Sequence, residues 1–191
     1  SNESDSGILF RVNNPSIGPN ALSGYYAGIN PKSKRLFLGR FDGNGSFVLL
    51  RNGAYMSDCI KVNDFNDIKV TATGPYIQAV INDKYFVETI DTTYKSGAIG
   101  VRANKAPAKF DDICVSSPEH SVYCENFNSD NTGINKEWSI HSGDWMRTPE
   151  GEYHISAGNN FISLTNNTNF KNFECFTDVR FTNELSSAAG I

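Results

Sequence analysis

Asn2-Glu3-Ser4-Asp5-Ser6-Gly7-Ile8 opens the chain, and Asn183-Glu184-Leu185-Ser186-Ser187-Ala188-Ala189-Gly190-Ile191 closes it, so both ends carry nearly the same stretch. At the front, the stretch leads into an apolar run at residues 9–12. At the back, it follows one at residues 173–181. The match predicts one hairpin cut at its turn, with its first strand at the C-terminal end and its second at the N-terminal end. We therefore expect a chain in permuted order, whose last third completes the sheets of its first two thirds.

Period-two alternation of apolar and polar residues dominates the rest of the chain and predicts strands rather than helices. Turn residues such as Asp42-Gly43-Asn44-Gly45 separate the runs and supply the positive φ that hairpins need. No amphipathic stretch is long enough for a substantial helix. Many short antiparallel strands at this spacing indicate an all-β sandwich or barrel. The expected strands are Gly7–Asn13, Gly24–Asn30, Arg35–Phe41, Ser46–Arg51, Ile68–Thr73, Tyr76–Asn82, Tyr85–Glu88, Ala98–Ala103, Phe110–Val115, Val122–Phe127, Glu137–His141, Asp144–Arg147, Tyr153–Ser156, Phe161–Leu164 and Phe173–Phe181.

The stretch Ser116-Ser117-Pro118-Glu119-His120 is the candidate boundary within the chain. The part after it is too short to bury a comfortable core by itself. We therefore expect a single sandwich over residues 1–191, built from residues 1–118 and 122–191 and joined by a linker at 116–121. Depending on whether this linker allows folding back, the protein is a monomer or a strand-exchanged oligomer.

Charge and hydropathy exclude two classes of partner. The net charge is −4 and lysines and arginines are scattered, so no basic stripe predicts nucleic-acid binding. No apolar run approaches the roughly 20 residues of a membrane span.

The cysteines are Cys59, Cys114, Cys124 and Cys175, with no CxxC pair. The 3 histidines stand at no metal-ligand spacing. An even number of cysteines permits one or two disulfides in a secreted protein. Free buried thiols are nevertheless the default expectation. Cys175 shares its parity with Phe173 and Val179, so it is expected to point inward.

Several segments together resemble the concanavalin A-like lectin/glucanase sandwiches. They are Gly7-Ile8-Leu9-Phe10-Arg11-Val12, Gly24-Tyr25-Tyr26-Ala27-Gly28-Ile29, Leu36-Phe37-Leu38-Gly39-Arg40, Asn66-Asp67-Ile68-Lys69-Val70, Thr73-Gly74, Ile81-Asn82-Asp83-Lys84, Asp91-Thr92-Thr93-Tyr94-Lys95-Ser96-Gly97-Ala98-Ile99-Gly100 and Ala108-Lys109-Phe110-Asp111-Asp112-Ile113. The closest likeness is to the fructan-binding modules of bacterial levanases. The lectin domain of galactocerebrosidases and the sandwich of the keto-disaccharide hydrolase family form a wider circle.

The resemblance implies an antiparallel jelly-roll sandwich that is circularly permuted. The resembling modules open with segments like Phe127 to Trp138, Gly143-Asp144-Trp145, Phe161-Ile162-Ser163-Leu164 and Cys175-Phe176-Thr177-Asp178-Val179. The strand like Gly7–Val12 follows only after these. In this chain the opening segments stand last. The order thus agrees with the matched ends.

Sugar sites combine aromatic faces with arginine and amide side chains that bond hydroxyls in pairs. The candidate residues are Arg11, Tyr26, Arg40, Arg102, Asn104 and Trp145. Arg11 is out of phase with Ile8 and Phe10 and is expected to face away from their core. Its alternative role is an ion pair with Asp178 or Glu174, and the alternative for Trp145 is the core. Arg102 and Asn104 sit where the resembling modules place residues near their ligand pocket.

Catalysis and metal binding have weaker patterns. Glycanases of related sandwiches carry Glu-x-Asp-x-x-Glu on one strand, and no such run exists here, so the protein is not expected to be an enzyme. No cofactor is expected apart from a structural calcium ion, for which Asp111, Asp112 and Glu125 are the candidate ligands. Ordinary strand ends and solvated turns are the alternative.

We therefore interpret the sequence as a non-catalytic carbohydrate-binding module of a secreted or cell-surface protein, recognising an end or short stretch of fructan or another glycan. The alternative is a structural or protein-binding sandwich repeat of an adhesin-like array. A glycosidase domain, the third alternative, requires paired carboxylates in a cleft. Convergence of Arg11, Tyr26 and Arg102 in one depression distinguishes the first interpretation from the second.

Overall fold

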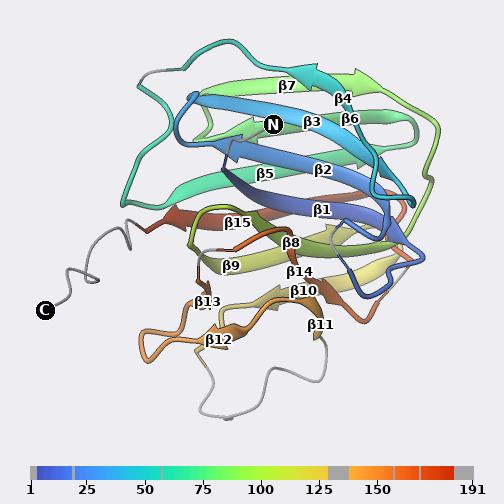
Figure 1. Cartoon of the computed structure of the whole chain (residues 1–191). Coiled ribbons are helices and arrows are strands. Elements are labelled where there is room, and N and C mark those ends of the chain that lie inside the picture. Colours follow the sequence, from blue (N-terminus) through green and yellow to red (C-terminus); the bar gives the residue numbers. More distant parts are fainter. Residues whose placement is uncertain are drawn as a thin grey trace, which may run out of the picture.

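The computed structural model describes residues 4–18, 20–56, 58–128, 138–156, 158–167 and 169–182 (Figure 1). These residues form fifteen strands and no helix. The strands are β1 (Asp5–Asn13), β2 (Ser23–Asn30), β3 (Arg35–Asp42), β4 (Phe47–Asn52), β5 (Asn66–Thr73), β6 (Tyr76–Ile81), β7 (Tyr85–Ile90), β8 (Ala98–Asn104), β9 (Ala108–Ser117), β10 (His120–Glu125), β11 (Trp138–Ser142), β12 (Trp145–Arg147), β13 (Tyr153–Ile155), β14 (Phe161–Thr165) and β15 (Phe173–Phe181).

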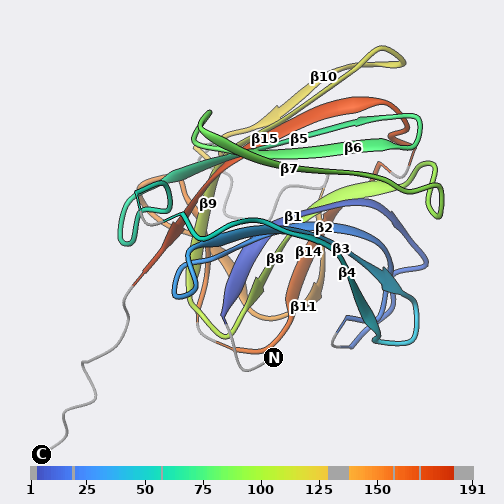
Figure 2. The same ribbon diagram turned by 90° about the horizontal axis from the view of Figure 1, so that it is seen from above.

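The strands pair antiparallel in two sheets that lie face to face (Figure 2). The first sheet has the order β11-β14-β8-β1-β2-β3-β4. The second has the order β12-β13-β9-β15-β5-β6-β7, with β10 added beside β9. The predicted all-β, two-sheet sandwich is therefore confirmed. Alternation of apolar and polar residues places strands such as β5 and β15, because a strand with one buried face needs that period. Strands β1, β2 and β8 are buried at nearly every position.

Strands from both ends of the chain lie within the same sheets. In the first sheet β14 pairs with β8, and in the second β15 lies between β9 and β5. The predicted cut hairpin is wrong, because β15 and β1 belong to opposite sheets. Instead, β1 begins and β15 ends beside the turn that joins β8 to β9. Asp5 pairs with Asn104, and Phe181 pairs with Ala108. Residues 1–3 and 183–191, which carry most of the matched ends, lie outside the described residues.

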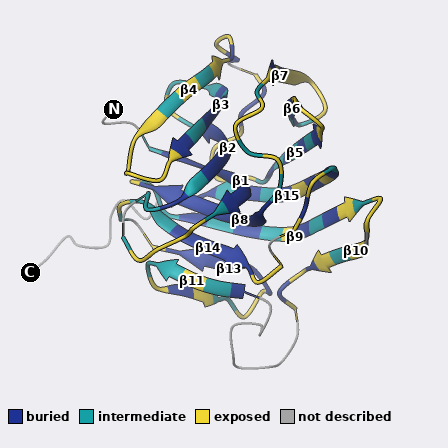
Figure 3. Ribbon diagram, turned by 90° about the vertical axis from the view of Figure 1, so that its right-hand side faces the viewer, coloured by how far each residue is buried: buried dark blue, intermediate teal, exposed yellow. Residues whose placement is uncertain are grey.

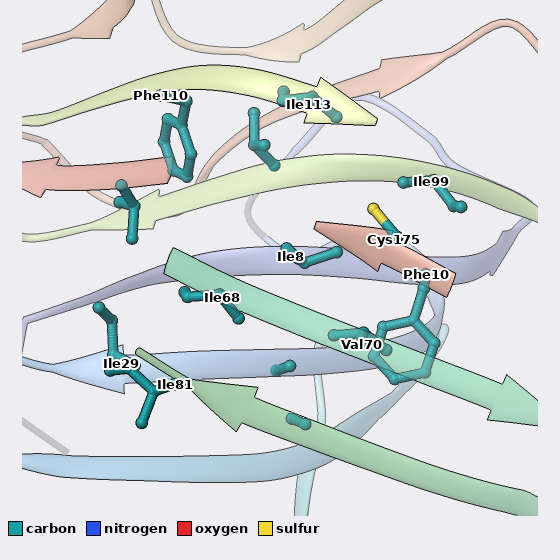
Figure 4. Close-up of a cluster of buried hydrophobic side chains, with 14 of the residues drawn as sticks. Ile8, Phe10, Ile29, Ile68, Val70, Ile81, Ile99, Phe110, Ile113 and Cys175 are labelled. Atoms are coloured by element: carbon teal, nitrogen blue, oxygen red, sulfur yellow. The ribbon is translucent and has the colours of Figure 1, made fainter. Parts of the chain in front are cut away.

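The main core fills the space between the two sheets. Ile8 and Phe10 of β1 point toward Ile68 and Val70 of β5, and Cys175 of β15 joins them (Figure 4). These side chains are at most 1% exposed. The prediction that Cys175 points inward is confirmed.

A β-bulge in β1 overturns the orientation expected for Arg11. The register shifts between Leu9 and Val12, and Arg11 itself has a φ of 49°. One extra residue reverses the alternation that follows it. Arg11 is consequently 1% exposed, and its guanidinium donates to the main-chain oxygens of Lys171 and Tyr94. Neither of the expected ion pairs, with Asp178 or with Glu174, is formed.

The stretch predicted as a linker forms the tip of a hairpin. Strand β9 runs to Ser117, which pairs with His120 at the start of β10. The hairpin extends from the body of the sandwich, with exposed positions along β10 (Figure 3). Directly opposite residues Cys114 and Cys124 form a disulfide across it. The default of free thiols is thus wrong for this pair, whereas Cys59 and Cys175 are free and buried.

Candidate functional site

A cleft of about 530 Å³ opens on the outer face of the first sheet, away from the main core. Aromatic side chains form one wall, and amide and charged side chains surround them. Strands β1 to β4 and β8 supply most of the lining, which consists of Asp5, Asn20, Tyr26, Asn30, Ser33, Arg35, Phe37, Phe41, Phe47, Leu49, Asn52, Arg102, Asn104, Lys105 and Asn160. This mixture of apolar surface and convergent polar groups is typical of a small-molecule site.

The aromatic wall rests on a second hydrophobic cluster, which lies on this outer face. Tyr26 and Phe41 belong to the cluster and are 1% exposed. Phe47 on the edge strand β4 covers them, with ring centroids 5.0 Å from Phe41 and 6.5 Å from Tyr26. Phe47 remains 41% exposed. It is therefore the aromatic face of this cleft with the most surface available to a ligand.

Two glycines allow the rings to lie close to the backbone of the sheet. A Cβ at Gly28 would stand 2.5 Å from the Phe37 ring, and one at Gly39 would stand 2.1 Å from the Phe47 ring. Both distances are shorter than any real contact allows. Glycine at these positions is therefore a packing requirement of the wall, since any side chain would displace a ring.

A buried ion pair between Arg102 and Asp5 holds the polar side of the cleft. These side chains are 6% and 13% exposed. The Arg102 guanidinium also donates to Asn20 Oδ1 at 3.1 Å and to Asn160 Oδ1 at 2.6 Å. Asn20 and Asn160 lie on two different loops, so one arginine orders amide groups from both. Its guanidinium carbon stands 4.9 Å from the centroid of the Tyr26 ring, which is cation–π distance.

The Asp5 carboxylate is bonded on both oxygens. Oδ1 accepts the Tyr26 hydroxyl at 2.7 Å as well as Arg102, and Oδ2 accepts Asn104 Nδ2 at 3.1 Å. Burial, and then the nearby Asp5 charge, raise the pKa of Tyr26 well above its ordinary value. Tyr26 is therefore a neutral hydroxyl donor at physiological pH. The arrangement fixes Tyr26, Arg102 and Asn104 around one carboxylate.

Tyr26, Arg102 and Asn104 are the predicted sugar residues that the structure brings together. Arg11 lies in a separate cleft of about 280 Å³ with Tyr94 and Lys171. The predicted convergence in one depression therefore holds for Tyr26 and Arg102 and is wrong for Arg11. Arg40 lies at the edge of the sandwich, where it pairs with Asp42 and Asp91 at 2.9 Å each.

Trp145 occupies the main core, as its alternative role requires. It is 4% exposed and stacks on Tyr153 at 4.8 Å between ring centroids. Its Nε1 donates to the main-chain oxygen of Ser142. Trp145 therefore supports the sheet and does not line the cleft.

The expected calcium ligands do not gather at one point. Asp111 and Asp112 lie on β9 with partly or fully exposed side chains, whereas Glu125 is buried. Glu125 accepts the main-chain N–H of Phe127 and lies 3.6 Å from Arg147. Within the described ranges, no three histidine, cysteine or acidic side chains are grouped so that they could hold a metal ion.

Sequence reasoning missed several residues of the cleft, including Asp5, Asn20, Phe47 and Asn160. Phe47 could have been predicted from its position. A phenylalanine beside the Asp42–Gly45 turn, on a short strand, is less able to pack in the core and is therefore a candidate for a surface site. The loop asparagines could not have been predicted, since asparagine is common in the turns of this chain. Their role depends on contacts with Arg102, which is 82 positions from Asn20 and 58 from Asn160.

The fold is a concanavalin A-like sandwich with a cleft on the outer face of one sheet. The sequence model of one family, described as 3-keto-alpha-glucoside-1,2-lyase-like domain, matches residues 1–116. The chain belongs to this carbohydrate-related family. No curated protein matches the chain. Among the described residues, no helix has the length and apolarity to cross a membrane.

Proposed function

We propose that the cleft around Tyr26, Phe47 and Arg102 binds a carbohydrate without cleaving it. The observation that carries this is the combination of an exposed aromatic face with convergent, pre-ordered amides. Phe47 offers its ring to the C–H face of a sugar. Asn20 and Asn160 are held by Arg102 before any ligand arrives, so little ordering free energy is lost on binding.

Hydrolysis by paired carboxylates has little support from this cleft. A glycosidase places two carboxyl groups roughly 5–9 Å apart across the scissile bond. Among the described lining residues, Asp5 is the one acidic side chain. Its two oxygens already accept bonds from Tyr26, Arg102 and Asn104. These contacts suit an anchoring role better than proton transfer.

The family description favours one second candidate, an elimination that cleaves a 3-keto-α-glucoside. Such a reaction needs one base to remove the proton at C2, next to the carbonyl. The C–H electrons form a C1–C2 double bond, the C1–O bond breaks, and the departing aglycone oxygen takes the proton from that base. Asp5 is the base available in the cleft, and Arg102 is the cation available to the developing enolate oxygen. The reaction would require Asp5 to exchange an existing hydrogen bond for the substrate proton.

The location of the protein, the identity of its glycan, the permuted order of its segments and its oligomeric state are also part of this proposal. The Cys114–Cys124 disulfide supports an oxidising, extracellular or cell-surface location. Fructan is the first glycan to test, by resemblance to levanase modules. Permuted order is proposed from the order in which the resembling segments stand along the chain. A monomer is consistent with both parts sharing sheets within one chain. An adhesin-like repeat without a sugar site is the alternative.

The test is binding to a glycan array, followed by calorimetric titration of the strongest ligand. Phe47→Ala should weaken binding about tenfold, which corresponds to about 1.4 kcal/mol. Phe86→Ala is the matched control, because Phe86 is 59% exposed on the edge strand of the other sheet. Equal affinities for the two variants, or no glycan bound by the wild type, would refute the proposal.

The elimination is tested separately with 3-ketosucrose and 3-ketotrehalose. Sugar release by the wild type but not by Asp5→Asn would establish the second candidate. Binding of these compounds without release would support the non-catalytic proposal.

A further inference from the structure

A second cleft, of about 390 Å³, lies on the same outer face of the first sheet. Most of its lining comes from β1, β8, β11 and β14. Val12, Ala98 and Leu164 form its apolar floor, and they belong to the same hydrophobic cluster that supports Tyr26 and Phe41 in the first cleft. The two clefts therefore share one continuous apolar base.

The polar lining of the second cleft consists of amides, hydroxyls and one imidazole. Asn13, Asn14, Ser139, His141, Thr165 and Asn166 supply them, and among the described lining residues there is no acidic, lysine or arginine side chain. Burial lowers the pKa of His141 below its ordinary value of 6.5, so the imidazole is neutral at pH 7. The Ser139 hydroxyl donates to Asn166 Oδ1, which orders two of these groups.

Two elements contribute residues to both clefts: strand β8 and the chain between β1 and β2. Ala98 lines the second cleft and Arg102 lines the first, on the same face of β8. Four residues of strand separate them, which is about 13 Å. The chain between β1 and β2 contributes Asn14 to the second cleft and Asn20 to the first.

We propose that the second cleft binds an uncharged sugar unit and that the ligand of this protein is an oligosaccharide contacting both clefts. This inference rests on the proposed function of the first cleft. Neutral amide and hydroxyl groups over an apolar floor bond sugar hydroxyls and cover a C–H face, and they give no compensation to a charged group. We therefore expect neutral sugars to bind this subsite more tightly than uronic acids or sulfated sugars.

The test compares inulin-type fructo-oligosaccharides and malto-oligosaccharides, each from the disaccharide to the heptasaccharide, by calorimetry. With the wild type, affinity should rise about tenfold with length in one series. His141→Ala and Asn14→Ala should abolish this gain and leave the disaccharide affinity unchanged. Ile140→Ala is the control, because Ile140 is exposed on the same strand but does not line the cleft. If affinity rises with sugar length as much in His141→Ala and Asn14→Ala as in Ile140→Ala, the inference is overturned.

The imidazole resonances provide a readout that does not depend on the first cleft. Of the 3 histidines, His141 is the one in the lining, and its signals should shift on addition of the heptasaccharide. The shift should persist in Phe47→Ala at higher sugar concentration. If Phe47→Ala binds like the wild type while His141→Ala does not, the proposed function of the first cleft fails and the second cleft stands as the sugar site. No shift with either series overturns the inference.

Discussion

Removing one carboxylate from the outer face of the second sheet should stabilise the protein at neutral pH. Asp178 on β15 pairs with Asp67 on one side and with Asp111 on the other, so three acids lie in a row. Burial raises the pKa of Asp111 to about 6; Asp112, Glu152 and Asp178 add to the rise, and a bond from the Asp112 N–H opposes it. Asp111→Asn keeps an acceptor for that N–H and removes the charge.

The sign and size of the effect follow from the raised pKa of Asp111. The folded state holds the proton more tightly than the unfolded chain, so ionisation destabilises the fold. The penalty is absent below about pH 4, grows as the pH rises, and is complete above about pH 6. A shift from 3.8 to about 6 corresponds to about 3 kcal/mol at full strength. The side chain is only partly buried, so solvent screening reduces the expected penalty to about 1 kcal/mol.

Urea unfolding of wild type and Asp111→Asn from pH 4 to pH 7 measures this penalty. The two free energies of unfolding should agree near pH 4, and the variant should be about 1 kcal/mol more stable at pH 7. The corresponding rise in Tm is about 2–4 °C. Asp144→Asn, a change at an exposed turn residue, should show no such divergence. A constant difference between Asp111→Asn and wild type over the whole range would refute the reasoning.

Three further predictions concern the ion pair, the disulfide and calcium. Asp5→Ala leaves the Arg102 guanidinium buried without a carboxylate. The free energy of unfolding, measured by urea denaturation, should therefore fall by about 3 kcal/mol. A loss below about 1 kcal/mol would contradict a buried ion pair. Replacing Cys114 and Cys124 by serine should lower the free energy of unfolding by about 2–3 kcal/mol, because the disulfide closes a loop of 10 residues. An unchanged urea midpoint under non-reducing conditions would contradict this stabilising role. If calcium binds at Asp111 as the sequence predicts, millimolar calcium should raise the Tm of the wild type and not of Asp111→Asn; equal responses would exclude that site.

Local pattern was sufficient for the strands. Phe173–Phe181 alternates in sequence, and its inward positions are buried in the structure while the others are exposed or intermediate. This succeeds because a strand packed on one face requires a period of two, whatever its partners are. Tyr26 was placed correctly for the same reason, since its neighbour Tyr25 takes the core side.

Local pattern failed where geometry depended on pairing partners. The bulge in β1 turned the Arg11 side chain toward the edge of the core. No residue pattern in Gly7–Asn13 predicts the extra residue of this bulge. The matched ends looked like two halves of one hairpin, but similar sequences beside two strands do not show whether the strands belong to one sheet or to opposite sheets. Register is a property of two strands together.

By itself, the sequence determined that this protein is an antiparallel all-β fold and which residues of most strands face its core, because both follow from short-range alternation. Only the tertiary structure decided the site. Asp5 and Arg102 meet across 97 positions of sequence, and Phe47 becomes a wall only where Gly39 leaves room for its ring. Side chains so far apart in sequence are brought together by strand order and packing, which no local stretch encodes.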